Sequence, residues 1–437
     1  MNIFRISREA VSLAMAYVGV LVGVGLSSGQ DLLQYFLSFG KMGLAGVVLL
    51  GLLNIIFGRI IVTLGSHYQS SNHQEVLAQI AHPVINRLID VTLLLSCFVV
   101  GFVMVAGAGA NLQQQFGLPS WLGALLCSLL VIIIAFMDFD RITKVLGVFT
   151  PVIVIMILAV AGYTFWGKSY DFSALEMAAS SLKPAMPNVW FSVLNYFALC
   201  AMNGVSMAFV LGGSVLRIVD AEKGGLLGGT IIAIIVGSAA LALFANLDLV
   251  KNAEIPMLVL VNNISPAFAF MYALVIFALI FNTAFSLYYA AARRFAGDNL
   301  QKMRFWLCGI VALGYLCSFG GFTTLVSYMY PLLGCLGIIL LVVLSVAWVQ
   351  ERENIIKEKF LRRKMIRLLF RKYDDDYEFT AKNKKAFQKL GEMSAADTEG
   401  IKAEVKAYVK SVVAANDDLQ AYADKYLSMD GSPLKGV

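Results

Sequence analysis

The fold is decided by the stretch Gly23-Val24-Gly25-Leu26-Ser27-Ser28-Gly29-Gln30-Asp31, which interrupts an apolar run from about residue 11 to residue 37. Unwound backbone inside a membrane leaves N–H and C=O groups unpaired at a cost of several kcal/mol each. It persists only where it lines a cavity or contacts a ligand. The stretch therefore predicts a membrane helix that is broken near its centre.

A second apolar run, from about residue 191 to residue 217, is interrupted at a similar depth by Asn203, Gly204 and Ser206. Two such breaks in corresponding positions of two halves are typical of secondary transporters, whose substrate site lies between the broken helices. We therefore predict two discontinuous helices that face a common site near the membrane midplane.

The composition is that of a membrane protein with a polar C-terminal region. Of the 437 residues, 59% are hydrophobic and 14% are charged, and the mean hydropathy is +0.77. Residues 1–350 contain 16 Lys and Arg and 13 Asp and Glu, whereas the last 87 residues contain 18 and 15. These values exclude an ordinary water-soluble domain. They predict a transporter domain over residues 1–350, a basic juxtamembrane helix over 351–373 and a helical cytoplasmic tail over 374–437.

Ten apolar segments are long enough to cross a bilayer core of roughly 30 Å, which takes about 20 helical residues. They cover residues 10–37, 42–65, 86–114, 120–137, 143–166, 189–216, 224–246, 266–293, 303–319 and 322–348. Five helices per half is an odd number, so the second half enters the membrane from the opposite side. The predicted fold is all-α, with ten transmembrane helices in a 5+5 inverted repeat of which helices 1 and 6 are discontinuous.

Basic residues predict the orientation, because they resist translocation. With the N-terminus inside, the cytoplasmic ends of the spans carry twelve Lys and Arg residues, and the outer loops carry only Lys41, Lys168, Lys183 and Lys251. We expect a multi-pass protein of the cell inner membrane with both termini in the cytoplasm. It should contact lipids and have no nucleic-acid partner.

The first break offers backbone groups to a ligand. Where the helix restarts, its free N–H groups and the positive end of its dipole favour a carboxylate or phosphate, and glycine lets a ligand approach bare backbone. Small residues that only allow close helix packing are the alternative. The predicted substrate-binding residues here are Gly23, Gly25, Ser27, Ser28 and Gly29.

Asp31 follows Ser28 with the spacing of a capping box, so its carboxylate is expected to close the first turn of the outer half-helix. An acid at that depth is also a candidate protonation or cation site, because carboxylates within membranes are costly and usually functional. Asp31 is therefore a candidate coupling or gating residue.

In the second broken run, Asn203 offers donor and acceptor groups beside Gly204, and Tyr196 lies seven residues earlier on about the same helical face. These three residues are predicted to hold the polar end of the substrate. The alternative is that Asn203 makes hydrogen bonds between helices, as Asn commonly does in membranes.

An oxygen-rich cluster in the eighth span, formed by Asn282, Thr283 and Ser286, is a candidate sodium site, because hard cations prefer oxygen ligands. Hydroxyls that bond back to their own helix are the alternative. No other cofactor is predicted.

An enzyme is not predicted. Residues 25–29 fit the Gly-x-Ser-x-Gly pattern of serine hydrolases, which needs a strand–turn–helix setting and a histidine partner. The only histidines, His67, His73 and His82, fall in one predicted cytoplasmic loop, which we interpret as solvated and not as a metal site.

Two segments resemble the YkvI-type amino acid permeases, a branch of the amino acid-polyamine-organocation superfamily with the LeuT fold. Residues 23–31 are similar to that family's Gly-Ala-Gly-Phe-Ala-Ser-Gly-Gln-Glu segment, with Leu26 in place of an aromatic residue and Asp31 in place of Glu. Residues 104–109 followed by Phe116-Gly117-Leu118-Pro119 also resemble the family. The resemblance covers roughly residues 1–350. It implies ten core helices, a site between the first and sixth, and alternating access by rocking of a helical bundle.

The basic, partly amphipathic segment 351–372 is expected to lie along the anionic inner leaflet. After it, a helix is expected from Thr380 to Leu390, ended by Gly391.

A second tail helix is expected to begin at a capping box of Ser394 and Asp397 and to run toward Leu427. Its apolar stripe is formed by Ile401, Val405, Tyr408, Val412, Ala415 and Leu419. Such a stripe buries against another surface. The first tail helix or the cytoplasmic face of the transporter is the favoured partner. A second subunit of a homo-oligomer or a separate cytoplasmic protein is the alternative.

Together these features predict a secondary active transporter of a small solute, with an amino acid or a related carboxylate as the favoured substrate. Coupling to sodium is expected slightly ahead of coupling to protons. The alternative is a non-transporting membrane sensor or scaffold that signals through its cytoplasmic tail.

Overall fold

The computed structural model describes residues 7–22, 28–70, 72–136, 149–166, 170–297, 299–371 and 379–414. Regular structure in these residues is entirely helical. The helices are α1 (Arg8–Val22), α2 (Gln30–Tyr35), η1 (Leu37–Phe39), α3 (Gly40–Tyr68), α4 (His73–Ile80), α5 (Pro83–Phe116), α6 (Ser120–Ala135), α8 (Phe149–Phe165), α9 (Phe172–Ser180), α10 (Val189–Gly213), α11 (Ile218–Ala245), α12 (Leu247–Val250), α13 (Pro256–Ile264), α14 (Pro266–Ala296), α15 (Leu300–Ser318), α16 (Phe322–Phe370), α17 (Ala381–Glu392) and α18 (Thr398–Ala414).

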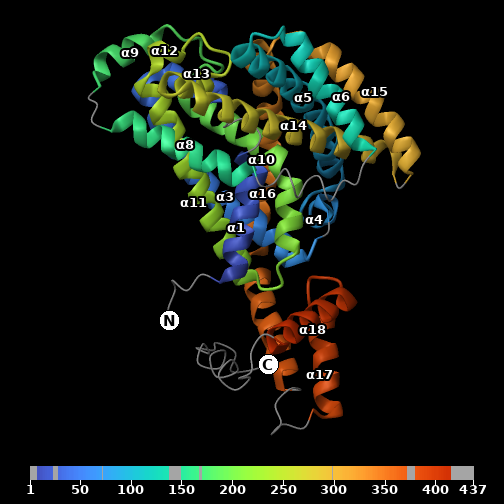
Figure 1. Ribbon diagram of the computed structural model, residues 1–437. Coiled ribbons are helices and arrows are strands. Elements are labelled where there is room, and N and C mark those ends of the chain that lie inside the picture. Colours follow the sequence, from blue (N-terminus) through green and yellow to red (C-terminus); the bar gives the residue numbers. More distant parts are fainter. Residues whose placement is uncertain are drawn as a thin grey trace.

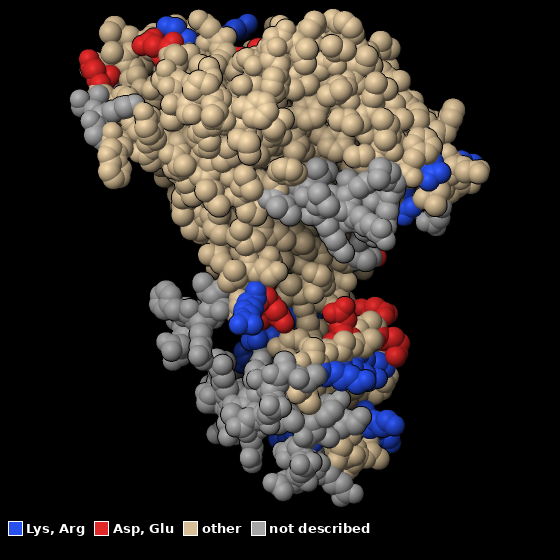
Figure 2. Space-filling view, in the orientation of Figure 1, with Lys and Arg blue, Asp and Glu red and all other residues tan. Residues whose placement is uncertain are grey.

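The helices form a large apolar body from which a small tail projects (Figure 1). Within the described ranges, six helical stretches are long and apolar enough to cross a membrane, and α6 and α8 are shorter apolar helices. Figure 2 shows a body surface that is mostly uncharged, with a few charged side chains at its far end and at one side, and many charged side chains on the tail. The chain is therefore a multi-pass membrane protein. Each of the ten predicted segments contains helix, while the count of ten membrane crossings stays a prediction.

The body consists of two four-helix groups. In the first group, α1, α3, α10 and α11 pack together, and in the second group α5, α6, α14 and α15 do so. Each of the first four predicted spans packs against the span five places later, as α1 does with α10, α3 with α11, α5 with α14 and α6 with α15. This pairing is what an inverted repeat would produce, although the repeat itself stays a prediction. Helix α16 contacts α10 from the first group and α5 from the second.

Glycines allow the first group to pack with its backbones in contact. A Cβ added to Gly225 of α11 would lie 2.4 Å from the carbonyl oxygen of Gly58 in α3. One turn later, a Cβ on Gly229 would lie 2.4 Å from the carbonyl oxygen of Asn54. Small residues at a repeat of four let membrane helices approach this closely, which replaces the hydrophobic driving force that is missing in lipid.

The first predicted break is a real discontinuity at its described end. Helix α1 ends at Val22 and α2 begins after Gly29, whose φ of 79° is left-handed. Glycine is needed here twice, because other residues avoid this φ and because an added Cβ would lie 2.8 Å from Leu243 and 2.9 Å from Met257. The predicted site residues Gly23, Gly25 and Ser27 lie outside the described residues.

The second predicted break is wrong. Helix α10 runs without interruption through Asn203, Gly204 and Ser206. Its small polar residues serve close packing. The Asn203 side-chain amide donates to the carbonyl of Leu199 in its own helix, at 3.0 Å. A Cβ on Gly204 would lie 2.5 Å from a methyl of Leu21 in α1. A continuous helix pairs its own backbone N–H and C=O groups, so no ligand is needed to bind them at these residues.

The basic segment after residue 350, whose expected place along the inner leaflet stays a prediction, is not a separate helix. It continues α16, a single helix of 49 residues, which leaves the body along its own axis (Figure 1). At 1.5 Å per residue, the part beyond residue 348 extends the helix by about 30 Å. The expected separate juxtamembrane helix is thus the lower end of the last predicted span.

The tail helices pack on this extension of α16. Ile401, Val405 and Val409 of α18 are buried in one cluster with Met365 and Phe387, which belong to α16 and α17. The apolar stripe of α18 is therefore covered by the chain's own helices, as the favoured expectation had it. The positions expected at Ala415 and Leu419 lie outside the described residues.

The tail helix boundaries differ from those expected. Gly391 lies inside α17, which ends one residue later at Glu392. At the start of α18, the Asp397 carboxylate accepts from the backbone N–H of Gly400 at 2.7 Å. Ser394 instead donates its hydroxyl to Glu358 of α16 at 2.6 Å. Ser394 is thus a contact between the tail and α16 and not a helix cap.

Candidate functional site

A buried carboxylate lies beside the break in the first span. Asp31 is 1% exposed, and its Oδ2 accepts a hydrogen bond of 3.1 Å from the hydroxyl of Tyr196 in α10. Its Oδ1 has no hydrogen-bond partner among the described residues. The expected capping role is not found, because Gly29 caps α2 without a side-chain bond and the N–H of Gln30 bonds to Ser28 Oγ. Asp31 and Tyr196, two predicted site residues, are therefore brought together across two helices.

Three buried tyrosines surround this carboxylate. The rings of Tyr35 and Tyr196 lie 5.1 Å apart, and Tyr330 of α16 interacts electrostatically with Asp31. The Tyr35 hydroxyl donates to Asn195 Oδ1 at 3.3 Å, whereas the Tyr330 hydroxyl has no hydrogen-bond partner. Sequence reasoning missed Tyr35 and Tyr330. Tyr35 lies one helical turn after Asp31, and this spacing could have placed both side chains on the same face of the helix.

Helix α2 is fixed to its neighbours by its last carbonyls and one side chain. The carbonyl of Tyr35 accepts from Ser192 Oγ of α10 at 2.6 Å, and the carbonyl of Gln34 accepts from the N–H of Ala185 at 3.0 Å. The Gln34 amide contacts α16, because its Oε1 accepts from the Ser327 hydroxyl at 3.1 Å. A six-residue helix cannot hold itself in place, so these bonds position Asp31 between α10 and α16.

The loop before α13 contacts the residue that precedes Gly29. The N–H of Met257 donates to the carbonyl of Ser28 at 3.0 Å. Gln114, at the end of α5, both donates to and accepts from the backbone of Ile255, at 2.9 and 3.0 Å. Ser28 is thus bonded to a segment that the second four-helix group holds.

Asn203 and Gly204 do not join the Asp31 site. The Ser96 hydroxyl of α5 donates to Asn203 Oδ1 at 2.6 Å, and the Asn203 amide is used within α10. This is the interhelical bonding that the sequence left open as the alternative. The hydroxyl of Ser206 contacts His73 Nδ1 at 3.1 Å, nearer the tail.

The candidate sodium cluster on α14 is partly used within its own helix. The Thr283 hydroxyl donates to the carbonyl of Leu279 at 3.0 Å. Asn282 Oδ1 is buried without a hydrogen-bond partner. A search of the described residues finds no group of three or more His, Cys, Asp or Glu side chains that could hold a metal ion.

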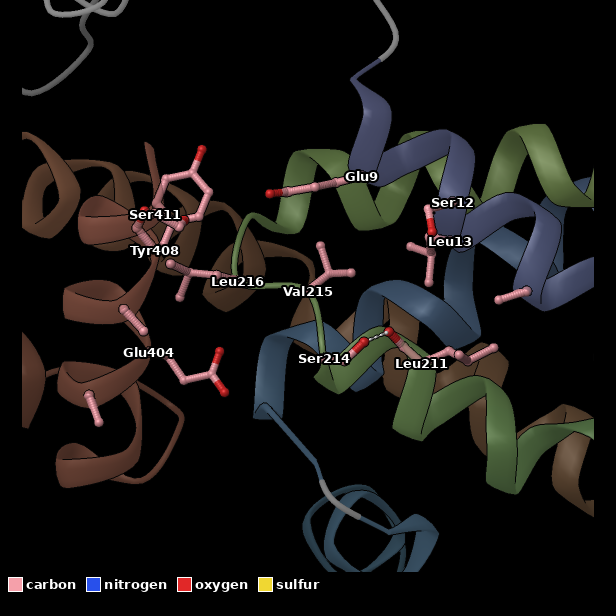
Figure 3. Close-up of a pocket in the computed structure, with 13 residues that line it drawn as sticks. Glu9, Ser12, Leu13, Leu211, Ser214, Val215, Leu216, Glu404, Tyr408 and Ser411 are labelled. Atoms are coloured by element: carbon pink, nitrogen blue, oxygen red, sulfur yellow. Dashed lines mark hydrogen bonds between the residues drawn. The ribbon is translucent and has the colours of Figure 1, made fainter. Parts of the chain in front are cut away.

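A cleft opens where the body meets the tail. It has a volume of about 740 Å³ and is lined by α1, by the end of α10 and by α18. In Figure 3, Glu9 of α1 and Glu404 of α18 extend into this space from different sides. Burial raises the pKa of Glu404, and Arg362 partly opposes that shift. The sequence analysis did not predict this cleft, because its walls come from three segments that are distant in the sequence.

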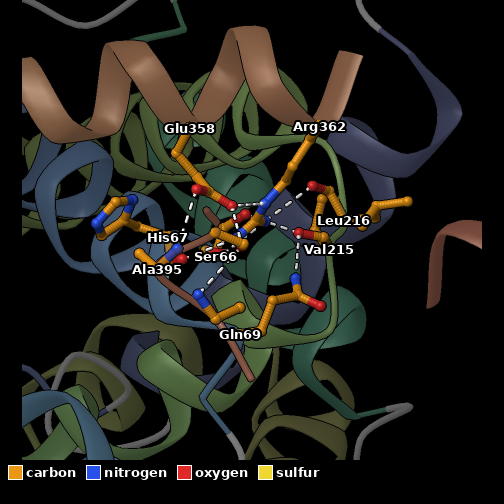
Figure 4. A network of polar contacts seen from close by, with 10 residues as sticks. Ser66, His67, Gln69, Val215, Leu216, Glu358, Arg362 and Ala395 are labelled. Carbon is orange, nitrogen blue, oxygen red and sulfur yellow. Dashed lines mark hydrogen bonds and ion pairs between the residues drawn. The ribbon is translucent and has the colours of Figure 1, made fainter. Parts of the chain in front are cut away.

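Arg362 connects α16 to the tail end of the body. Its guanidinium donates to the carbonyls of Ser66 at 2.8 Å, His67 at 2.7 Å and Leu216 at 3.0 Å (Figure 4). It thereby caps the C-terminal end of α3 and holds the loop that follows α10. Sequence reasoning assigned Arg362 to the lipid surface. Arg362 lies four residues after Glu358, and this spacing on a helix could have predicted the ion pair between them.

Two of the three histidines do not belong to a solvated loop, whereas His82 is exposed. His67 is buried in the last turn of α3. His73 opens α4 and lies 3.6 Å from Asp90 of α5, which also pairs with Arg294 of α14. Burial lowers the pKa of His73, and Asp90 opposes that shift. His73 thus contacts α5 and α10, one helix from each four-helix group.

Comparison with known proteins supports a transporter fold. No family model matches the chain. Two Bacillus subtilis (strain 168) proteins are similar to it. The uncharacterized membrane protein YkvI is 26% identical over 326 residues, which cover 75% of this chain and 92% of YkvI. The uncharacterized protein YyaD is 25% identical over 339 residues, which cover 77% of this chain and 96% of YyaD.

Among solved structures, that of MhsT in complex with L-phenylalanine matches with a TM-score of 0.52 at 15% sequence identity. The match covers 92% of this chain and 97% of MhsT. The protein is therefore a membrane protein with the LeuT fold of secondary transporters. Its relatives by sequence are YkvI and YyaD.

Proposed function

We propose that the protein is a secondary active transporter that moves a small solute, an amino acid or a related carboxylate, across the cell inner membrane by alternating access. The observation that carries this proposal is the broken first span, whose restart at Gly29 brings the buried Asp31 beside Tyr196. MhsT, which shares the fold, was crystallised with an amino acid, L-phenylalanine. That likeness supports the proposed class of solute.

In this proposal the substrate carboxylate binds at the break, near Ser27, Ser28 and Gly29, with Gly23 and Gly25 giving access to backbone N–H groups. Tyr196 faces the same region and contributes to the site. Asn203 and Gly204 are left out, because the Asn203 side chain bonds to Ser96 of α5 and Gly204 packs closely against Leu21 of α1. Asp31 serves coupling or gating. A sodium site at Asn282, Thr283 and Ser286 is weakened by the bond of Thr283 within its own helix.

The test is uptake of amino acids by proteoliposomes, after a thermal-shift screen has found the solutes that stabilise the protein. Wild-type protein should show saturable uptake that depends on an ion gradient. Gly25→Leu should abolish it while the protein still inserts and folds. Uptake by Gly25→Leu equal to that of wild type would remove the proposed site.

A matched pair of glycines tests the described end of the break. Gly29 and Gly321 both have a φ of 79°, but an added Cβ meets Leu243 and Met257 at Gly29 and meets nothing within 4 Å at Gly321. Backbone strain is therefore present in both Gly29→Ala and Gly321→Ala, and it is larger at Gly321, whose ψ is 141° compared with −4° at Gly29. Only Gly29→Ala also changes the site. Uptake should fall strongly only in Gly29→Ala. Equal losses in both variants would mean that strain alone explains them.

A sensor or scaffold is the second candidate function, favoured by the Arg362 contacts that join the tail to α3 and to the loop after α10. Truncation after residue 373 separates the two candidates. Transport that persists without α17 and α18 would make the tail regulatory at most. Full-length protein that binds a solute but never moves it would favour the sensor.

A further inference from the structure

Asp31 has no positively charged partner. Within the described parts of the chain, no Lys, Arg or His nitrogen forms an ion pair with its carboxylate, and Tyr196 supplies its one side-chain hydrogen bond. The adjoining residues 23–27, which are outside the described ranges, are Gly, Val, Gly, Leu and Ser and contribute no ionisable side chain.

Every ionisable group that the described residues place near Asp31 is neutral at physiological pH. Helix α10 presents Tyr196 and Cys200, α16 presents Tyr330, and α2 itself contributes Tyr35. Helix α11 and the start of α13 meet the beginning of α2 through Leu243 and Met257, which are apolar. The carboxylate is thus enclosed by four weak acids and by hydrocarbon.

An ionised carboxylate in this setting would be costly. Burial of an unpaired charge is so unfavourable that such a group normally takes up a proton instead, and acids within membranes mark proton relays for this reason. The hydrogen bonding fits the neutral acid. Among the described residues, Oδ2 accepts from Tyr196, as a carbonyl oxygen does, while Oδ1 receives no side-chain donor and can carry the proton.

We propose that Asp31 is the proton-coupling residue of the transport cycle, protonated in this closed arrangement and deprotonated when the site opens to the cytoplasm. The proposal rests on the proposed transport function and makes its coupling ion a proton. One proton from the outer water binds the carboxylate Oδ1 to give the acid. The same proton leaves to the cytoplasmic water as the carboxylate is hydrated, so each cycle moves one proton.

The transport test compares two driving forces and two variants. With one proton per solute, an inward gradient of about one pH unit should concentrate a zwitterionic solute about tenfold. A tenfold proton ratio and a tenfold solute ratio across the membrane correspond to the same free energy. Asp31→Asn should lose this accumulation and keep solute exchange across the membrane, because exchange needs no net proton movement. Asp248→Asn is the control, because Asp248 is exposed and pairs with Lys251 outside the site. It should accumulate solute like wild type.

Accumulation by Asp31→Asn equal to that of wild type, or wild-type accumulation driven by sodium at equal pH on both sides, would overturn the proposal. A second measurement does not depend on transport. The infrared difference spectrum between wild type and Asp31→Asn, both in detergent at neutral pH, should contain the C=O stretch of a protonated carboxylic acid. Absence of that band would overturn the proposal even if no transported solute is found. Presence of the band with no transport of any solute would instead count against the proposed function alone.

Discussion

Arg362 and Glu358 form an ion pair of 2.7 Å one turn apart in α16, and both side chains are almost completely buried. Glu358 also accepts from the Ser394 hydroxyl and the N–H of Ala395, which lie between the two tail helices. Because Arg362 binds the carbonyls at the end of α3, the pair joins the tail to the body. Movement of α3 relative to α16 would therefore have to break or carry this contact.

Removal of either member of the pair should destabilise the protein strongly. Arg362→Met leaves the Glu358 charge buried without its partner, and loss of one member of a buried pair typically costs about 3–5 kcal/mol. The double variant Arg362→Met/Glu358→Met should be more stable than either single variant, because no unpaired charge remains. Thermal unfolding in detergent measures this cycle. Additive losses in the double variant would show that the pair is not coupled.

Acidification should destabilise the contact between α4 and the two four-helix groups. Burial lowers the pKa of His73 below its usual value, so the folded state favours the neutral ring. Stability is then fully present above the unfolded pKa of about 6.5 and is lost as the pH falls through the folded pKa. Wild-type protein should lose more thermal stability than His73→Gln between about pH 8 and about pH 5.5. Parallel pH profiles would contradict this role of His73.

Asn203 should matter for helix packing and not for solute binding. Asn203→Leu removes the acceptor of the Ser96 hydroxyl, and such bonds between membrane helices contribute about 0.6 to 1.7 kcal/mol. Ser96→Ala should lose a similar amount, and both variants should keep the thermal shift produced by a bound solute. A lost solute response with unchanged stability would return Asn203 to the binding site.

The two breaks illustrate what the sequence could and could not predict. Glycine and serine near residue 29 gave the right prediction, since Gly29 needs a left-handed φ and leaves no room for a Cβ. The same residue types near Gly204 gave the wrong one. There, the absence of a side chain on Gly204 leaves room for Leu21 of α1 to pack against α10. Composition alone does not distinguish an opened helix from a closely packed one, because the deciding neighbour comes from a distant part of the chain.

Polar contacts were the least predictable features. The spacing of Ser28 and Asp31 indicated a local cap, but the carboxylate instead bonds to Tyr196, which is 165 positions away in the sequence. Arg362 belongs to a basic run typical of lipid-facing segments, yet its partners are carbonyls of α3 and of the loop after α10. The length of the apolar runs predicted where helices form, since burial in lipid acts on each helix separately, while the ten membrane crossings stay a prediction. Polar partners depend on the assembled fold.

Two glycines of α11 provide a matched test of the contact between α3 and α11. A Cβ on Gly225 would meet only backbone atoms, those of Gly58 and Arg59, within 2.9 Å, whereas a Cβ on Gly237 meets nothing within 4 Å. Backbone cannot move aside as a side chain can, so Gly225→Ala should lose about 1–3 kcal/mol through overpacking. Gly237→Ala should instead gain up to about 1 kcal/mol from helix propensity. Thermal unfolding of both variants measures the difference, and a stabilised Gly225→Ala would mean that α3 and α11 are not in backbone contact.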